Sequence, residues 1–431
     1  MKVLQIIVLL IICLTQRVEL LIPPKFQWKT IDFAWNGDLK NVAMASGGYI
    51  PENIMPTGLA RWKNKLFIAI PRWKKGVPSS LNYVYLNGSQ SEPLLPYPSW
   101  KDAFILDDAE TINSNATVVS AFRMHVDKCD RLWVVDNGVA DMSTDVKQIA
   151  EPAVVVFDLN RDSVVRRYEM TGEVLRDSSV LTSVVVDFVG KSCDCGEAYA
   201  YITDMGSNAL IVYSFKDDDA WRVENHYFHF DPHAGVYKVG GIDFYGSDGV
   251  SSAALSQVKS DGYRDLYLHP TSSTKQFKMS TKLLRHKDAP EEEIFNGVLV
   301  VGEKGPFSQA SACDFDPKNN VLFFTQVCKN AIGCWNIDKP FTPQNTPTVV
   351  RDCTLLEFPN DVKVDKEGNL WILSDRQARF LHGHLDPAQV NFRVLTAPVT
   401  KLIQGTACER SSLVTRAWSA LSSRRNSAKA K

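Results

Sequence analysis

A hairpin pattern recurs along this chain and constrains the fold more than any other feature. Residues 124–136 read MHVDKCDRLWVVD, residues 362–374 read VKVDKEGNLWILS, and a looser copy, CDFDPKNNVLFFTQ, spans residues 313–326. In each copy an apolar run leads into a polar turn and then into a second apolar run, which is typical of an antiparallel hairpin. A hairpin that returns at long intervals predicts an all-β fold of units repeated around an axis.

The second strands of these hairpins give the number of units. Segments of this type return at intervals of roughly 50–70 residues, and strand-like runs such as NYVYL, AVVVFDL and ALIVYSF follow the first three of them. We therefore predict a six-bladed β-propeller with a central channel, which can use all 431 residues. Because the spacing is irregular, a pair of β-sandwiches is the alternative. The six segments are LFIAI (66–70), LWVVD (132–136), AYAYITD (198–204), DLYLH (265–269), VLFFTQ (321–326) and LWILS (370–374).

The N-terminus is typical of a secretory signal. Lys2 precedes an apolar run at residues 3–14 that is too short to cross a bilayer, with a buried first strand as the alternative. We assign residues 1–18 to a signal peptide, 19–410 to the propeller domain, and 411–431 to a basic, disordered tail that contains Arg and Lys but no acid. No later segment is long and apolar enough for a membrane span, so we expect a secreted, extracellular protein.

Charge and cysteine content agree with this compartment. The net charge of −1 argues against a nucleic-acid partner, which normally requires a basic excess. Asn87 and Asn115 begin Asn-x-Ser/Thr sequons and are candidate glycosylation sites. After Cys13 is removed with the signal, an even set of cysteines remains, which favours disulfides over a metal site at the Cys193-x-Cys195 pair.

The predicted blade geometry separates two faces of the ring. Asp127, Asp316 and Asp365 fall in hairpin turns, where we expect their carboxylates to make local Asx-turn bonds. The opposite mouth should collect the starts of inner strands and the ends of second strands. This set combines carboxylates, amides, hydroxyls and an aromatic ring: Thr57, Arg72, His125, Asp136, Ser183, Asp204, Gly241, Gln309, Ser311, Thr325, Gln326, Phe358, Asn360, Asp361 and Asp375.

Such a mouth can bind a small amine, a catechol or an indole. Asp361 or Asp204 would pair with an ammonium and Phe358 would supply a ring face, with Thr325 as a further ligand contact. The alternative is that these groups satisfy the backbone and buried waters of a polar channel.

Histidine-rich segments and nucleotide motifs give no support for a cofactor. His226, His229 and His233 are spaced like metal ligands, but a strand edge with stacked rings explains them better. His382 and His384 alternate on one face of an expected strand and lack a third ligand. The sequence has neither a Gly-x-Ser-x-Gly elbow nor a Walker loop. We therefore expect no metal and no organic cofactor.

Several long motifs make the chain resemble the insect yellow / major royal jelly protein family. The resemblance runs in order from about Phe26 to Cys408 and implies a secreted six-bladed propeller. It also implies disulfides between Cys129 and Cys193 and between Cys334 and Cys408, and leaves the pairing of the other cysteines open. The motifs are PTGLARWKNKLFIAIPRWKKGVPSSLNYV, VDKCDRLWVVDNG, YAYITDMGSNALIVYSF, FDPHAGVYKVGGIDF, NAIGCWN, FPNDVKVDKEGNLWILSDR and VNFRVLTAP.

Members of this family differ in function, and two hypotheses follow from the resemblance. The first is an L-dopachrome isomerase of melanin synthesis, with His125 as the base, Gln309 and Asn360 as donors to the ring oxygens, Asp361 in the same catalytic group, and Arg72 on the substrate carboxylate. The second is a non-catalytic binder of biogenic amines or catechols at the same mouth. A structural protein of pigmented cuticle is a third possibility.

Overall fold

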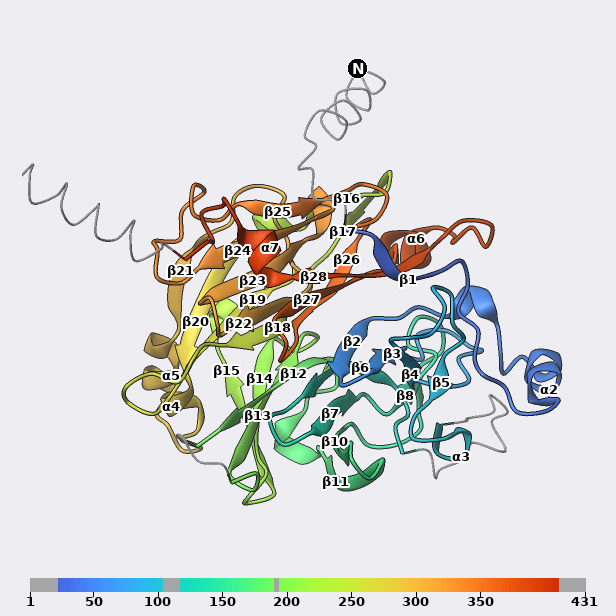
Figure 1. The fold of residues 1–431 in the computed structure, drawn as a ribbon. Coiled ribbons are helices and arrows are strands. Elements are labelled where there is room, and N and C mark those ends of the chain that lie inside the picture. Colours follow the sequence, from blue (N-terminus) through green and yellow to red (C-terminus); the bar gives the residue numbers. More distant parts are fainter. Residues whose placement is uncertain (1–21, 104–116, 190–193, 411–431) are drawn as a thin grey trace, which may run out of the picture.

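The computed structural model describes residues 22–103, 117–189 and 194–410. The predicted signal peptide, Asn115, Cys193 and the predicted tail lie outside these residues. Within them, six four-stranded antiparallel sheets are arranged around a channel, so the predicted six-bladed propeller is confirmed (Figure 1). The six expected second strands are all present, each within one residue of its predicted bounds.

Five blades are built from consecutive segments, with the first strand innermost. In chain order they are β2 (Gly58–Trp62), β3 (Lys65–Ala69), β4 (Leu81–Tyr85) and β5 (Leu95–Pro96); β6 (Ala121–Val126), β7 (Arg131–Asp136), β10 (Ala153–Asp158) and β11 (Ser163–Glu169); β12 (Leu181–Phe188), β13 (Ala198–Asp204), β14 (Ala209–Ser214) and β15 (Asp219–Glu224); β18 (Val250–Leu255), β19 (Asp265–Pro270), β20 (Lys275–Ser280) and β21 (Leu299–Glu303); β22 (Cys313–Asp316), β23 (Val321–Gln326), β24 (Ala331–Asn336) and β25 (Thr348–Arg351).

The sixth blade joins the two ends of the described chain. β26 (Pro359–Val364), β27 (Asn369–Ser374) and β28 (Phe392–Pro398) are followed by β1 (Pro24–Trp28), which pairs antiparallel with β28 as the outermost strand. Trp28 lies opposite Phe392, and both side chains are buried. The ring is therefore closed by hydrogen bonds between its first and last strands, a feature that the repeat pattern did not predict.

The hairpin turns explain why the repeated motif pairs an Asp with a Trp six residues later. Asp127 accepts hydrogen bonds from the backbone N–H of Arg131 at 3.0 Å and from Trp133 Nε1 at 2.9 Å. Asp365 repeats this with the N–H of Asn369 at 2.8 Å and Trp371 Nε1 at 2.7 Å. The local Asx-turn bonds predicted for these carboxylates are confirmed, and they tie each turn to its returning strand.

Short elements lie outside the six sheets. The helices are α2 (Leu39–Ser46), α3 (Trp100–Ala103), α4 (Thr281–Leu284), α5 (Glu291–Gly297), α6 (Gln377–His382) and α7 (Val399–Ile403), and the two extra hairpins are β8 (Val139–Ala140) with β9 (Lys147–Gln148) and β16 (Val236–Val239) with β17 (Ile242–Tyr245). None of the helices in the described ranges is long and apolar enough to cross a membrane.

One predicted disulfide is confirmed and one is corrected. Cys334 is bonded to Cys408 as expected, but Cys129 is bonded to Cys195 and not to Cys193. The two candidates are two residues apart in the sequence, and Cys195, the one nearer to β13, is bonded to the β6–β7 turn. Cys353 is also disulfide-bonded, whereas Cys313 and Cys328 are free thiols.

Candidate functional site

The channel has two ends, and the inner strands define them. We call the end where these strands begin the start face, and the end where they run into the hairpin turns the turn face. Asn360 is the second residue of β26 and lies toward the start face, whereas His125 is the fifth of the six residues of β6 and lies toward the turn face. The prediction that Asn360 and His125 share one mouth is therefore wrong. We predicted His125 at the start of an inner strand, whereas β6 begins four residues earlier, at Ala121.

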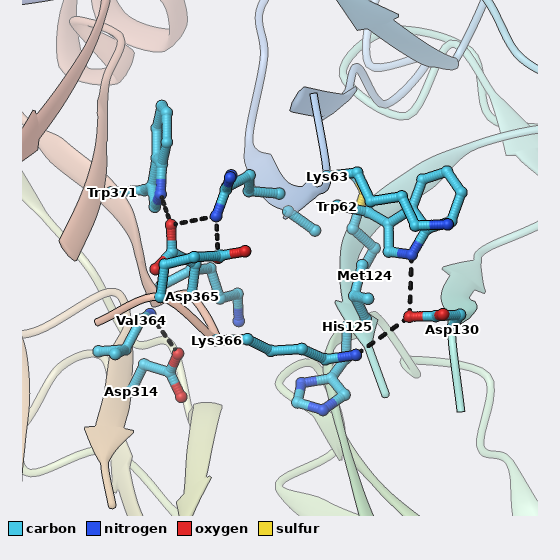
Figure 2. A pocket seen from close by; sticks show the side chains of 15 residues that line it. Trp62, Lys63, Met124, His125, Asp130, Asp314, Val364, Asp365, Lys366 and Trp371 are labelled. Atoms are coloured by element: carbon cyan, nitrogen blue, oxygen red, sulfur yellow. Dashed lines mark hydrogen bonds and ion pairs between the residues drawn. The ribbon is translucent and has the colours of Figure 1, made fainter. Parts of the chain in front are cut away.

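A cavity of about 110 Å³ opens at the turn face between the first, second, fifth and sixth blades (Figure 2). Apolar atoms of Met124 and Val126 and the rings of Trp62 and Trp371 contribute to its wall. Most of the remaining lining residues carry charge or hydrogen-bonding groups: Ala60, Arg61, Lys63, His125, Asp130, Asp314, Lys363, Val364, Asp365, Lys366 and Glu367.

Most charges at the rim of this cavity are already paired. Arg61 lies 3.0 Å from an Asp365 carboxylate oxygen and also contacts Glu367. Lys366 lies 3.2 Å from Asp130, which also accepts the indole N–H of Trp62 at 3.0 Å. These pairs connect the sixth blade to the first and second blades, and they fix the shape of the opening more than they add stability.

Three titratable groups, His125, Asp314 and Lys363, belong to inner strands and line the cavity behind this rim. Burial lowers the pKa of His125 to about 4, and the nearby positive charge of Lys363 contributes, so its imidazole is neutral at physiological pH. Burial raises the pKa of Asp314, whose carboxylate accepts the N–H groups of Val364 at 2.7 Å and Phe315 at 2.9 Å. A neutral imidazole and a carboxyl with a raised pKa in one cavity are a pattern found at acid–base sites.

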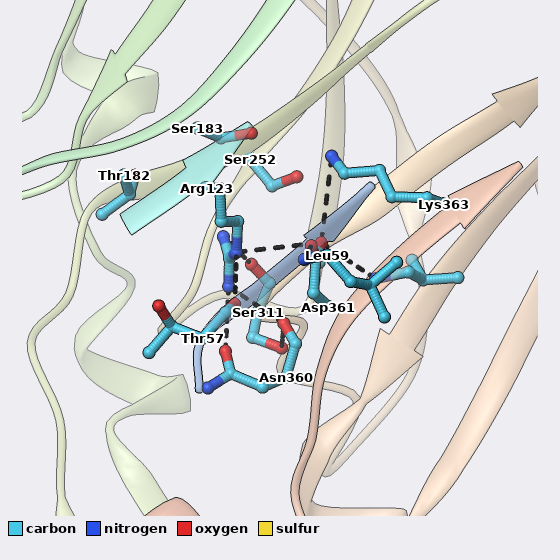
Figure 3. A network of polar contacts seen from close by, with 12 residues as sticks. Thr57, Leu59, Arg123, Thr182, Ser183, Ser252, Ser311, Asn360, Asp361 and Lys363 are labelled. Atoms are coloured by element: carbon cyan, nitrogen blue, oxygen red, sulfur yellow. Dashed lines mark hydrogen bonds and ion pairs between the residues drawn. The ribbon is translucent and has the colours of Figure 1, made fainter. Parts of the chain in front are cut away.

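At the start face, one arginine joins the inner strands across the channel (Figure 3). Arg123 is 2% exposed and donates to the carbonyl oxygens of Thr57 at 3.3 Å, Ser251 at 3.1 Å, Ser311 at 3.0 Å and Asn360 at 2.9 Å. These acceptors precede or begin the inner strands of four different blades. Arg123 itself belongs to β6 of the second blade, so its guanidinium connects five of the six blades. We call this guanidinium and its acceptors the hub.

The residues that we predicted around this mouth are engaged by the protein itself. The Asn360 amide accepts from Arg123 at 2.9 Å and donates to Asp375 and to Gln377. Asp361 is fully buried and accepts the N–H groups of Leu59 at 3.0 Å and Val362 at 2.9 Å. The satisfaction of buried backbone groups, which was the alternative explanation of this polar set, therefore accounts for these contacts.

A hairpin covers this end of the channel. β16–β17 contacts the turn after β23 and α6 of the sixth blade, and its Tyr237 and Val239 pack against Phe358. Gln309 Nε2 donates to the carbonyl oxygens of Ala234 and Val236 at 2.9 Å each. Thr325 is fully buried and its hydroxyl accepts the N–H of Ser311 at 2.9 Å. The ligand roles of Gln309, Thr325 and Phe358 stay predictions that require this hairpin to move.

Arg72 and Asp204 are held away from the channel axis. Arg72 is 4% exposed and its guanidinium donates to the carbonyl oxygens of Val119 at 2.8 Å, Ala103 at 3.1 Å and Pro78 at 3.3 Å. Burial raises the pKa of Asp204, but hydrogen bonds from Ser179, Ser207 and Arg222 outweigh it, so the pKa lies below its usual value. Both side chains brace loops, and neither lines the turn-face cavity.

Histidines and glycosylation sites complete the comparison with the sequence. His382 ends α6 and is not in the expected strand, and its ring stacks on Phe244 with 4.6 Å between centroids. Among the residues described, no three His, Cys, Asp or Glu side chains are grouped as metal ligands. Asn87 lies in an exposed turn after β4, where a sequon is accessible.

Known proteins match this chain closely enough to settle its family. The model of the family described as major royal jelly protein matches residues 119–408, about two-thirds of the chain. The chain belongs to the major royal jelly protein family. Within it, Protein yellow of Drosophila melanogaster is 38% identical over 390 residues, which cover 89% of this chain and 70% of that protein. Protein yellow of Drosophila subobscura is 37% identical over the same length and is covered to 67%.

Solved structures align with this chain only at low sequence identity. A protein of unknown function from Bacteroides thetaiotaomicron aligns over 87% of this chain and 76% of its own, with a TM-score of 0.48 and 11% identity. A luciferin-regenerating enzyme aligns over 80% of this chain and 92% of its own, with a TM-score of 0.43 and 10% identity. We draw no argument about function from matches at this level.

Two residues of the channel, Arg123 and Lys363, were missed by sequence reasoning, although the sequence contains a signal for both. Arg123 interrupts the apolar strand AFRMHV, and Lys363 interrupts PNDVKV, each at a position that faces the channel. A long cation in the middle of an inner strand is rarely fully buried unless it has partners inside. Such residues were therefore candidates for the channel from the start.

Proposed function

We propose that this protein is secreted, acts in the melanin pathway of pigmentation, and isomerises L-dopachrome to a dihydroxyindole at the turn-face cavity. Its family membership, its likeness to Protein yellow and its disulfides support the pathway and the extracellular compartment. The observation that carries the chemical part is His125, a neutral imidazole in the wall of a cavity that also holds cations and indole rings.

The reaction requires little from the protein. A base removes the proton from the ring carbon that bears the carboxylate, the bonding electrons shift through the ring, and a quinoid oxygen gains a proton. A second proton then passes from the neighbouring ring carbon to the other quinoid oxygen, and the product is a dihydroxyindole that keeps the carboxylate. His125 would accept the first proton because its imidazole is unprotonated at neutral pH. Dopachrome rearranges without a catalyst, so a modest lowering of the barrier suffices, and no metal or organic cofactor takes part in this scheme.

The second candidate is a non-catalytic binder of amines or catechols in the same cavity. The observation that favours it is the low pKa of His125, about 4, because a base is most effective when its pKa lies near the working pH. Trp62 and the carboxylate of Asp130 would then serve an aromatic amine without any proton transfer. Both candidates use one cavity and differ in whether His125 is needed.

The test is the loss of dopachrome absorbance with purified, disulfide-intact protein, compared with heat-denatured protein. We expect a saturable acceleration that His125→Ala abolishes, and an unchanged rate for His229→Ala, whose histidine lies far outside the cavity. If the wild-type protein does not accelerate the reaction, the isomerase proposal fails. Calorimetric titration with serotonin and dopamine then tests the binder, whose affinity should survive His125→Ala.

A further inference from the structure

Lys363 is the most buried of the cations that line the turn-face cavity, and its ion pair is long. It is the fifth residue of β26, its side chain is 9% exposed, and it lines the cavity beside His125. Its Nζ lies 3.8 Å from a carboxylate oxygen of Asp361 (Figure 3). Among the described residues, no other carboxylate lies within ion-pair distance of Lys363. A separation of 3.8 Å exceeds the length of a hydrogen bond.

Asp361 neutralises Lys363 only in part, because its carboxylate also interacts with two backbone N–H groups and a second cation. Its two oxygens accept the N–H groups of Leu59 and Val362, and Arg123 Nε lies 3.8 Å from the same carboxylate oxygen that Lys363 approaches (Figure 3). Two buried cations therefore share one carboxylate. By contrast, Lys366 at the rim has Asp130 to itself at 3.2 Å.

The nearest other acid does not remove this excess of positive charge. Burial raises the pKa of Asp314, the charge of Lys363 lowers it, and its oxygens accept the N–H groups of Val364 and Phe315. The remaining charged groups that line the cavity are paired or lie at the rim; Arg61 lies near the end of strand β2, and the others are Lys63, Asp130, Asp365, Lys366 and Glu367 of the turns. An anion that enters the cavity thus finds Lys363 at its inner end.

We propose that Lys363 binds the carboxylate of the substrate and makes this protein selective for carboxylated indolequinones over their decarboxylated analogues. This inference rests on the proposed function, since it assigns the substrate class of the same cavity. It also replaces Arg72, whose guanidinium is used up by backbone carbonyls. Because the carbon that loses its proton carries the carboxylate, a salt bridge to Lys363 would hold that carbon beside His125.

Turnover of two chromes tests the selectivity. Dopachrome carries the carboxylate, and dopaminechrome is the same ring system without it. We expect the wild-type protein to favour dopachrome in kcat/KM, and Lys363→Met to reduce this ratio by roughly tenfold, the usual value of one charge-assisted contact. Lys363→Arg should keep most of the preference. Lys366→Met removes the same charge from the rim and should change the ratio by less than about twofold, because Lys366 is exposed and already paired.

A binding measurement separates this inference from the proposed function. Indole-2-carboxylate and indole are titrated by calorimetry into the wild-type protein and Lys363→Met, after thermal unfolding has shown that both are folded. A carboxylate preference that is lost in Lys363→Met supports the inference even if neither chrome is turned over, in which case only the isomerase proposal falls. Equal turnover of both chromes, or a preference that Lys363→Met leaves intact, overturns the role of Lys363 while the isomerase stands.

Discussion

Replacement of Arg123 by methionine should destabilise the ring more than a typical core substitution. Methionine keeps the apolar part of the side chain but removes five hydrogen bonds of 2.9–3.3 Å to Thr57, Ser251, Ser311 and Asn360. The acceptors stay buried, and Asp361 loses one of its two cations. Relief of the desolvation of the guanidinium offsets part of this loss, since burial lowers the pKa of Arg123. We expect a net cost of about 3–5 kcal/mol, as for other broken buried ion pairs.

Thermal unfolding of the disulfide-intact protein measures this cost. The entropy of unfolding is about 2.1 cal/mol/K per residue, or roughly 0.8 kcal/mol/K for a domain of roughly 390 residues. A loss of about 4 kcal/mol then lowers Tm by about 5 °C. Arg123→Lys keeps the charge but not the planar fork, so its Tm should fall between those of the wild-type protein and Arg123→Met.

A small effect would refute the reasoning. If Arg123→Met lowers Tm by less than about 1 °C, the hub does not hold the blades together and its hydrogen bonds are replaceable by water. The double variant with Asp361→Asn adds a second check. Because the two side chains interact, the combined loss should be smaller than the sum of the single losses.

Three other perturbations have defined outcomes. Cys334→Ser opens a disulfide with a sequence separation of 74, which in the chain-entropy model costs about 4 kcal/mol, and denaturant unfolding with and without reductant measures it. Burial raises the pKa of Asp375 to about 8, so the folded protein keeps a proton that the unfolded chain loses near pH 4. The free energy of unfolding, measured by denaturant titration, should therefore fall as pH rises from about 4 to 8. The variant Asp375→Asn should flatten this slope. Gly240 has a φ of +60° at the tip of the β16–β17 hairpin, where a Cβ would collide with the Glu357 carboxylate. The variant Gly240→Val should therefore loosen the hairpin. Hydrogen exchange at the Tyr237 amide should then be faster than in the wild-type protein.

Local patterns of the sequence predict the blades well, because each hairpin encodes its own turn. Asp127 with Trp133 and Asp365 with Trp371 are bonded within one turn, so the pattern and the contact coincide. β1 was missed for the opposite reason: PKFQW is short, begins with proline, and finds its partner in β28 at the other end of the chain. A pairing over such a distance has no local signature.

The site was harder to predict than the fold because it depends on where each strand begins. Placing the start of β6 near His125 rather than at Ala121 moved that histidine from one end of the channel to the other. The resemblance to the family implied Cys193 as the partner of Cys129, and the actual partner, Cys195, is two residues away in the sequence. Repeat patterns give the number and order of strands, but a side chain's position along the axis requires strand ends correct to within about one residue, since each step advances roughly 3.3 Å.

The pairing of β1 with β28 also sets the order in which the molecule can be completed. β1 is the first strand of the described residues to be made, and its partner β28 is the last. Until then, β1 is unpaired and the sixth blade, which closes the ring between the fifth and first blades, is incomplete. A nascent or truncated chain that lacks β28 is thus an open arc whose exposed edge can pair with another chain. Cellular quality control would act on that arc, and truncations that remove β1 or β28 should damage the same blade.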